Sequence, residues 1–258
     1  MNKIKIIFFD IDGTLLPMHH KQLSPATLEC LQKLQSQGIL LVLATGRSAM
    51  TLPNFDGIHF DAFLTFNGSV CFNQEGILYH QPIPKEDVKK IYANAKAINR
   101  PIAFASLNEL IASGYDQDLA DYYAFANQKL IPDVDFAKMF DKDIYQIMMG
   151  AYEHEYEAIL KDVRGAKIAS WWHRAIDIIP AHSGKGIAIE KMLEVLNIDK
   201  QHAMAFGDGN NDIEMLQTVG WGVAMANASD KLKAVANDIC DSVENDGIYH
   251  YCLKHHII

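Results

Sequence analysis

The sequence predicts an α/β fold in which a parallel-sheet core is interrupted by an inserted α+β domain. First, short apolar runs without alternation, such as 4–10, lie between helix-like segments, which is typical of strands buried on both faces of a parallel sheet. Second, the block after Pro82 contains adjacent strand-like segments with fewer helices, which favours an antiparallel sheet. Third, the strand–helix alternation returns after Pro180, so the core resumes there.

The first third of the chain is predicted to contain strands at 4–10, 39–43 and 62–66 and a helix at 24–37. The helix begins at Ser24-Pro25, a capping residue followed by a proline that suits the first turn, and it ends at Gly38. Strands separated by short helices are usually joined by right-handed crossovers. We therefore expect these strands to lie in one parallel sheet.

The middle block is predicted to form an α+β unit with an antiparallel sheet. Its predicted helices cover 85–98, 116–128 and 153–163, and its predicted strands cover 101–106, 109–113, 144–151, 166–172 and 175–179.

The last third is predicted to return to the core, with helices at 185–196, 211–218 and 246–255 and strands at 203–207 and 221–225. Insertions are tolerated at exposed loops whose ends are neighbours. We therefore assign 1–82 and 182–258 to the core and 83–181 to the inserted domain.

The composition is that of a soluble globular protein, with 49% hydrophobic and 21% charged residues. The net charge of −9 argues against a general surface for nucleic acid or anionic membranes. We expect no cleaved leader, because the chain leads from Met1 into the first strand, and no membrane span, because no apolar run approaches about twenty residues. The four cysteines lack Cys-x-x-Cys spacing, which predicts neither disulfides nor zinc and favours a cytoplasmic protein.

Two carboxylates, Asp10 and Asp12, directly follow the first apolar run and precede Gly13. Asp-x-Asp-Gly can form a simple turn, since Asp and Gly suit loop conformations. A calcium loop of the EF-hand type would need a closing Glu at position 21, which is Lys21, so that interpretation fails. Two like charges at a strand end are costly unless a cation joins them or one holds a proton. Metal binding or proton transfer is therefore the better interpretation.

Other core elements also carry short polar signatures. These are Ala44-Thr45-Gly46-Arg47, Asn67-Gly68, His182-Ser183-Gly184-Lys185-Gly186 and Gly207-Asp208-Gly209-Asn210-Asn211-Asp212. Taken singly, Thr45-Gly46 could be a turn, Lys185 a solvated helical residue and Asp212 a helix cap. Because the carboxyl ends of parallel strands meet at one edge of a sheet, the order and joint presence of these signatures favour one shared site.

Two phosphate-binding motifs can be excluded. A dinucleotide fingerprint beginning at Gly207 would need a glycine where Asp212 stands, and Lys185 lacks both the earlier glycine and the following Ser or Thr of a P-loop.

The residues of these signatures suit phosphoryl transfer, which needs neutralised oxygens and an in-line nucleophile. Asp10 can act as nucleophile and form an aspartyl-phosphate. Asp12 can protonate the leaving alcohol and then deprotonate the hydrolytic water. Thr45 and nearby N–H groups can hold the phosphoryl oxygens, and Lys185 can neutralise charge as it develops. Mg²⁺ suits the surplus of carboxylate oxygens.

On these residues the chain resembles the haloacid dehalogenase superfamily, and within it the Cof-type phosphatases. Asp10 to Thr14 match Asp-x-Asp-Gly-Thr, Thr45 matches the strand-ending Thr or Ser, Lys185 matches the signature Lys, and Gly207 to Asp212 match Gly-Asp-Gly-x-Asn-Asp. Phe66-Asn67-Gly68 and Asn245-Asp246-Gly247-Ile248 also resemble the subfamily. The resemblance implies a Rossmann-like core with a large α/β cap inserted after the third core strand.

The resemblance also implies roles for individual residues. Asp10 would be nucleophile and metal ligand, Asp12 would be the acid/base and would bind the metal through its backbone carbonyl, and Asp208 would be a further metal ligand. Asp212 would lie near the metal or orient Lys185. The phosphate and substrate contacts would come from Thr45, Gly46, Arg47, Asn67, Lys185 and Asn211, with Trp172 and His173 contributed by the cap.

One departure from the family pattern follows the last core strands. Many relatives have Met-Gly-Asn-Ala where this chain has Met225-Ala226-Asn227-Ala228. We expect the change to alter loop packing and not chemistry.

We interpret the sequence as a Mg²⁺-dependent phosphatase of small phosphorylated metabolites, acting as a monomer or homodimer without nucleic acid or membrane. Sugar phosphates, flavin mononucleotide and pyridoxal phosphate are all credible substrates. A phosphomutase on the same scaffold is one alternative, which the few cap arginines, Arg100, Arg164 and Arg174, disfavour. A non-enzymatic sensor of phosphorylated metabolites is another, but a pure binder has no need of an acid/base such as Asp12.

Overall fold

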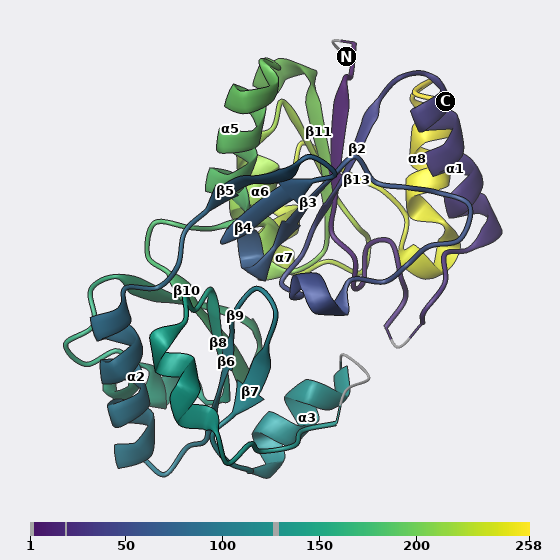
Figure 1. Ribbon diagram of the computed structural model, residues 1–258. Coiled ribbons are helices and arrows are strands. Elements are labelled where there is room, and N and C mark those ends of the chain that lie inside the picture. The colour runs from purple at the N-terminus through teal and green to yellow at the C-terminus, as the bar shows by residue number, and fades with distance from the viewer. Residues whose placement is uncertain (1–2, 19, 126–128) are drawn as a thin grey trace. The chain divides into compact units, whose positions relative to one another are not determined.

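The computed structural model describes residues 3–18, 20–125 and 129–258. The chain forms two compact units (Figure 1). The first unit comprises Met1–Thr45, Pro53–Tyr79 and Lys185–Ile258, and the second comprises Gly46–Leu52 and His80–Gly184. The short segment Gly46–Leu52, which follows the second core strand, therefore groups with the second unit.

The first unit is built on an eight-stranded sheet in the order β13-β12-β11-β1-β2-β3-β4-β5. The strands are β1 (Ile6–Phe9), β2 (Leu40–Ala44), β3 (Ala62–Thr65), β4 (Val70–Asn73), β5 (Gly76–His80), β11 (Ala203–Gly207), β12 (Trp221–Ala224) and β13 (Asp238–Ile239). β1 is fully buried and lies between β11 and β2, parallel to both. The predicted parallel core is therefore confirmed, and the carboxyl ends of its central strands share one edge.

Helices cover both faces of this sheet (Figure 1): α1 (Pro25–Ser36) and α8 (Gly247–Lys254) pack together, as do α5 (Lys185–Leu196) and α6 (Ile213–Thr218). The short helix α7 (Asp230–Lys233) follows β12 along the chain. The predicted start of α1 is confirmed, because the side chain of Ser24 accepts a hydrogen bond of 3.0 Å from the Thr27 N–H. Asp246 precedes α8 in the left-handed conformation, at φ 53°.

The sheet is not parallel throughout, because β4 runs antiparallel to β3. The reversal takes place at Phe66 and Asn67, whose φ values of 52° and 55° lie in the left-handed region. A second turn follows β4, where the side chain of Asn73 accepts hydrogen bonds from the N–H groups of Glu75 and Gly76. The strands β4, β5 and β13 and the helix α7 were not predicted from the sequence.

The second unit contains a five-stranded sheet in the order β7-β6-β8-β10-β9, in which every pair of neighbours is antiparallel. The strands are β6 (Ile102–Ala105), β7 (Leu110–Ala112), β8 (Gln146–Gly150), β9 (Ala166–Trp172) and β10 (Ala175–Pro180). Its helices are α2 (Lys85–Ala97), α3 (Gln117–Phe125) and α4 (Tyr156–Ile159). The predicted antiparallel sheet is therefore confirmed.

One predicted helix of this unit differs from the structure, and another extends beyond the described residues. The helix predicted at 153–163 is wrong in length, because a 3₁₀ turn at Glu153–Glu155 precedes only four residues of α4, and Asp162 then adopts a left-handed φ of 61°. The end of the helix predicted at 116–128 lies outside the described residues. The core of the unit includes Phe104, Ile147 and Ile176 of the sheet in one buried cluster with Ile91 of α2 and Ile159 of α4.

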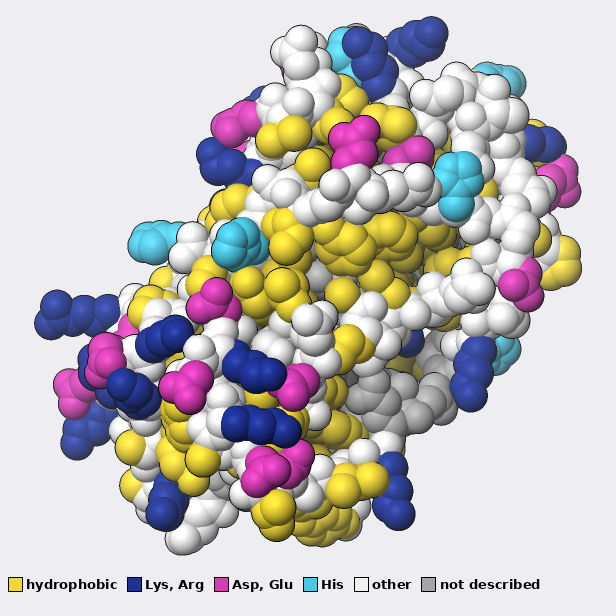
Figure 2. Space-filling view, in the orientation of Figure 1, with side chains coloured by type: hydrophobic (Ala, Val, Ile, Leu, Met, Phe, Trp, Pro, Cys, Tyr) yellow, Lys and Arg dark blue, Asp and Glu magenta, His cyan; other side chains and the backbone are white. Residues whose placement is uncertain are grey.

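On the face drawn in Figure 2, Lys and Arg side chains are interspersed with Asp and Glu side chains. On α2, for example, Lys89 pairs with Glu86 at 2.9 Å and Lys90 pairs with Asp87 at 3.3 Å. Among the helices that the structure describes, none combines the length and the apolar character that a membrane span requires.

Candidate active site

Two central strands bring two acidic signatures together. β1 pairs with β11 in a register that aligns Phe9 with Phe206, and the two rings stack at 5.6 Å with an interplanar angle of 3°. Asp10 follows Phe9, and its N–H donates to the Phe206 carbonyl at 3.0 Å. Asp208 lies two residues beyond Phe206. The parallel pairing therefore places Asp10 and Asp208 side by side at one sheet edge.

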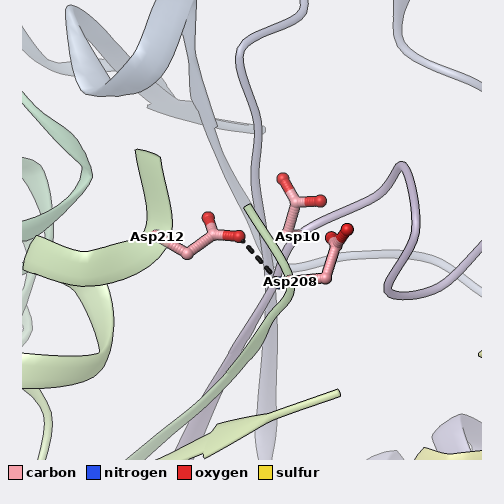
Figure 3. A group of neighbouring side chains, drawn as sticks. All are labelled: Asp10, Asp208 and Asp212. Carbon is pink, nitrogen blue, oxygen red and sulfur yellow. Dashed lines mark hydrogen bonds between the residues drawn. The ribbon is translucent and has the colours of Figure 1, made fainter. Parts of the chain in front are cut away.

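A third carboxylate, that of Asp212, joins this pair (Figure 3). One oxygen from each of Asp10, Asp208 and Asp212 lies within 4.8 Å of the others. Asp212 is fixed from its own loop, since its Oδ2 accepts hydrogen bonds of 3.0 Å from the N–H groups of both Asp208 and Gly209. Three carboxylates this close form an oxygen-rich group that suits a hard cation.

A buried lysine neutralises part of this charge. Lys185 begins α5 and is only 1% exposed. Its Nζ donates to Asp10 Oδ1 at 2.6 Å and to Asp212 Oδ1 at 2.5 Å. A buried cation persists only when it is paired and hydrogen-bonded. Lys185 is therefore a fixed positive charge beside Asp10, and not a solvated helical residue.

Lys185 does not neutralise all three carboxylates, and the pKa values of Asp10 and Asp208 are raised. Burial raises the pKa of Asp10 to about 7, with Asp212 and Asp12 adding to the rise and Lys185 opposing it. Burial and the neighbouring Asp10 and Asp212 raise the pKa of Asp208 to about 8. One lysine is thus insufficient for three clustered carboxylates, and a divalent cation would supply the missing charge. The donor set fits Mg²⁺, with hard oxygens and no thiol or imidazole in the group.

The loop after Asp10 holds Asp208 in place. Gly13 adopts φ +87°, and a Cβ added there would lie 2.2 Å from Asp208 Oδ2, so no larger side chain fits. Thr14 Oγ1 donates to Asp208 Oδ1 at 2.9 Å. Asp12 is half-buried, and its side chain is not part of the three-carboxylate group. This role of Thr14 was not predicted from the sequence.

The signatures that contain Thr45, Asn67 and Asn211 are joined by hydrogen bonds. Thr45 is 1% exposed, and its carbonyl accepts from the Asn67 N–H at 3.0 Å. Asn67, held in the left-handed conformation, accepts from Asn211 Nδ2 at 3.1 Å. Asn211 precedes Asp212, which binds Lys185. The structure therefore links Thr45, Asn67 and Asn211 to the charged cluster within the first unit.

Four predicted residues belong to the second unit. Gly46 and Arg47 are both half-buried, and Arg47 donates to the Thr51 carbonyl at 3.3 Å. Trp172 ends β9, and Arg174 lies over its ring at 4.9 Å. His173 is exposed in the two-residue turn between β9 and β10. His173 therefore lies in the hairpin turn and not in the strand β9, which ends at Trp172.

Asn227 has a role that was not predicted from the sequence. Its Nδ2 donates to the Gly13 carbonyl at 2.8 Å, and its Oδ1 accepts from the Val243 N–H at 3.1 Å. The side chain therefore ties the loop of Asp12 to the C-terminal segment. The sequence did contain a signal for this role. Asn227 is an amide residue in the loop that follows a core strand, and that loop lies at the same edge of the sheet as Asp208.

Comparison with known proteins gives consistent matches over almost the whole chain. A model of the haloacid dehalogenase-like hydrolases matches residues 7–252. The chain is 28% identical over 262 residues to the 5-amino-6-(5-phospho-D-ribitylamino)uracil phosphatase YitU of Bacillus subtilis (strain 168), covering 95% of each. It is 29% identical over 266 residues to the HMP-PP phosphatase of Escherichia coli (strain 55989 / EAEC), covering 96% of this chain and 94% of that one. Among solved structures, the HAD subclass IIB sugar phosphatase BT4131 matches with a TM-score of 0.90 at 29% identity, over 98% of this chain and 100% of that chain.

Proposed function

The chain belongs to the haloacid dehalogenase-like hydrolases and is a phosphatase of small phosphorylated compounds, and we propose that it uses Mg²⁺ and forms an aspartyl-phosphate on Asp10. The observation that carries this proposal is the buried group in which Lys185 binds both Asp10 and Asp212 beside Asp208. It combines a nucleophile with a fixed positive charge and a place for a cation.

In the first step an oxygen of Asp10 attacks phosphorus, and the bond from phosphorus to the leaving alcohol breaks. Asp12 donates a proton to the leaving oxygen. In the second step Asp12 accepts a proton from water, whose oxygen attacks phosphorus and breaks the bond to Asp10. Lys185 stays within hydrogen-bond reach of Asp10 and stabilises negative charge throughout.

Mg²⁺ would be held by Asp10 and Asp208, with Asp212 nearby and the Asp12 carbonyl as a further ligand, and it would neutralise phosphoryl oxygens when bound. The side chains of Asn67 and Asn211, the hydroxyl of Thr45 and the segment Gly46-Arg47 would bind the phosphoryl group. For Thr45, Asn67 and Asn211 this assignment is supported by the hydrogen bonds from the Asn67 N–H to the Thr45 carbonyl and from Asn211 to Asn67, which hold these three residues together before substrate arrives.

We further propose that 83–181 is a cap that selects the substrate, inserted into a core of 1–82 and 182–258. All the charged catalytic residues belong to the first unit. The sequence of the second unit can therefore differ between enzymes with different leaving groups without changing the catalytic residues. The substrate would be a sugar phosphate or a phosphorylated cofactor, and the protein a cytoplasmic monomer or homodimer. The four cysteines are buried free thiols, which suits a reducing compartment.

Two arginines of the second unit are already bound to carboxylates, and this favours hydrolysis over mutase activity. Arg100 binds Glu155 through two parallel hydrogen bonds of 2.9 Å, and Arg174 binds Asp118 and Asp121 at 2.7 Å. Both guanidinium groups are thus already paired within the second unit. A phosphomutase must also bind a second phosphate group on its sugar substrate, and this requires cationic side chains. Arg100 and Arg174 do not fit that role, because both already bind carboxylates.

The proposal is tested by measuring phosphate release from p-nitrophenyl phosphate, acetyl phosphate, glucose 6-phosphate, flavin mononucleotide and pyridoxal 5′-phosphate. We expect release with Mg²⁺, loss of release with EDTA, and recovery when Mg²⁺ is restored. Quenching turnover with hydroxylamine should convert an acyl phosphate into a hydroxamate, which peptide mass spectrometry would locate at Asp10. Undiminished activity in EDTA would exclude the metal, and a hydroxamate elsewhere would exclude Asp10.

A further inference from the structure

Asp246, the residue that precedes α8, has two features that its own helix does not explain. It adopts the left-handed conformation, at φ 53° and ψ 40°, which is uncommon for a residue with a side chain. An aspartate at the start of a helix usually accepts a hydrogen bond from an N–H group of the first turn. Within the described part of the chain, the Asp246 carboxylate makes no such bond to α8. Its place and conformation therefore point to another use of the carboxylate.

The carboxylate binds Ser24, at the start of α1. Ser24 Oγ donates a hydrogen bond to Asp246 Oδ1 and accepts one from the Thr27 N–H at 3.0 Å. Both Ser24 and Asp246 are half-buried, so water competes less for their bond than it would at an open surface. The two residues are 222 positions apart in the sequence. The bond therefore attaches the start of α1 to the C-terminal segment of the chain.

The turn that contains Asp246, at 242–247, is also attached to the loop that follows β1. Backbone hydrogen bonds of 3.0 and 3.1 Å within the turn close it. The Val243 N–H in this turn donates to Asn227, whose side chain donates to the Gly13 carbonyl. The same turn thus holds the chain at Gly13 and, through Asp246, again at the start of α1.

Asp12 lies in a compact turn that the chain forms directly after β1. The N–H groups of Leu15 and Leu16 donate to the Ile11 carbonyl at 3.0 and 2.8 Å. The turn at 11–16 is therefore held together by its own hydrogen bonds. Where Asp12 points depends on how this turn as a whole is attached to the rest of the first unit.

The connection from this turn to α1 is short, since only 17–23 separates it from Ser24. Without the bond to Asp246, the start of α1 loses its attachment to the C-terminal turn, and the connection gains conformational freedom. Asp12 would share that freedom. A general acid must lie close to the atom that it protonates, and a misplacement of about 1 Å can slow a reaction about a hundredfold.

We propose that Asp246 is a positioning residue for the phosphatase reaction, because by binding Ser24 it restrains the chain between Asp12 and α1 and keeps Asp12 directed at the leaving oxygen. The inference rests on the proposed role of Asp12 as acid/base. α1 and α8 also pack together, and Cys30 and Cys252 on these helices are fully buried. Loss of the bond between Ser24 and Asp246 should therefore leave the fold intact.

Two substitutions of Asp246 test the carboxylate. Asp246→Gly removes it and suits the left-handed backbone, whereas Asp246→Asn keeps an oxygen that can accept from Ser24. We expect Asp246→Gly to lower kcat/KM for glucose 6-phosphate about three- to tenfold. The kcat/KM for p-nitrophenyl phosphate should fall less than about twofold, because its leaving group hardly needs a proton. Asp246→Asn should restore most of the loss.

Asp162→Gly is the matched control, because Asp162 is also left-handed, at φ 61°, and is exposed in the second unit. It should keep the wild-type ratio of the two kcat/KM values. Ser24→Ala removes the same bond as Asp246→Gly from the other side. The double variant should therefore show the ratio of the Asp246→Gly variant, and a ratio changed by the product of the two single effects would overturn the inference.

Hydrogen exchange separates this inference from the phosphatase proposal, because it needs no turnover. Peptides that cover 14–23 should exchange faster in Asp246→Gly than in the wild type or Asp246→Asn, and Asp162→Gly should match the wild type. Unchanged exchange there, or an equal loss of kcat/KM on both substrates, would overturn the inference even in an active phosphatase. Faster exchange in a protein that hydrolyses no phosphate ester would overturn the phosphatase proposal while supporting the attachment through Asp246.

Discussion

The Nζ atom of Lys185 lies 2.6 Å from Asp10 Oδ1, and both groups are buried. The same Nζ donates to Asp212 Oδ1 at 2.5 Å, so a single cation is shared by the carboxylate assigned as nucleophile and by one that is anchored to the Asp208 loop. This arrangement restrains the Asp10 side chain and stabilises its ionised form. It also means that substitutions of Asp10 and Asp212 have different consequences for stability.

Asp10→Asn should abolish turnover, because an amide is a poor nucleophile and a weaker metal ligand than a carboxylate. The variant should remain folded, because Lys185 keeps Asp212 as a charged partner. Phosphate release from p-nitrophenyl phosphate and the melting temperature check both points. Full activity in this variant would exclude Asp10 as the nucleophile.

Asp12→Asn should slow turnover by roughly a hundredfold or more, through loss of the acid/base. The loss should be larger for alkyl phosphates than for p-nitrophenyl phosphate, whose leaving group hardly needs a proton. The measurement is the ratio of kcat values for the two substrates in the variant and in the wild type. An equal loss on both would refute a role in protonating the leaving group.

Metal-free protein should lose stability as the pH rises from about 4 to about 8. Folding raises the pKa of Asp10 to about 7 and that of Asp208 to about 8, so in this range the native state holds protons that the unfolded state has released. The free energy of unfolding therefore falls with increasing pH across that window. Because Mg²⁺ replaces these protons, it should raise the melting temperature more at about pH 8 than at about pH 5.

The check is calorimetry in EDTA and in excess Mg²⁺ at both pH values. Asp208→Asn, which removes one of the two titrating groups, should flatten the metal-free profile. A metal-free melting temperature that rises steadily with pH over this range would contradict the raised pKa values.

Asn227→Ala should lower both stability and kcat. It leaves the Gly13 carbonyl and the Val243 N–H without their partner, which should cost about 1–3 kcal/mol of unfolding free energy, and it frees the loop that carries Asp12. The matched control is Asn237→Ala, which removes a 2.7 Å hydrogen bond from the Gly222 N–H on the strand β12. That variant should lose melting temperature and retain kcat at low temperature. The same kcat in both variants would show that Asn227 has a structural role alone.

Trp172→Ala and His173→Ala test whether the end of the β9–β10 hairpin selects substrate. If one of them contacts the leaving group, its loss should raise the KM for the preferred metabolite and leave p-nitrophenyl phosphate nearly unaffected. Trp172→Ala also removes the ring under Arg174, so its melting temperature must be measured alongside. If neither variant changes the ratio of the two specificity constants, this hairpin does not select substrate.

The sequence was most informative where a residue's position along a strand settles its environment. Asp10 could be placed because the apolar run before it is buried on both faces, and such a strand must end at the sheet edge. The turn that reverses the chain after β3 was not predicted, because Phe66 and Asn67 reach the left-handed region without a glycine at either position. The helix predicted at 153–163 was too long for a similar reason. Asp162 adopts the left-handed conformation there, and an aspartate is not a strong signal for the end of a helix.

The sequence by itself determined the α/β core, the antiparallel sheet of the second unit and the set of polar signatures at the core sheet edge. These follow from local patterns, since apolar periodicity and turn residues depend on neighbours along the chain. Only the tertiary structure decided that Lys185 is buried between Asp10 and Asp212 and that Asn227 holds the Gly13 carbonyl. Burial, charge compensation and hydrogen-bond satisfaction are set by residues distant in sequence, so no local pattern specifies them.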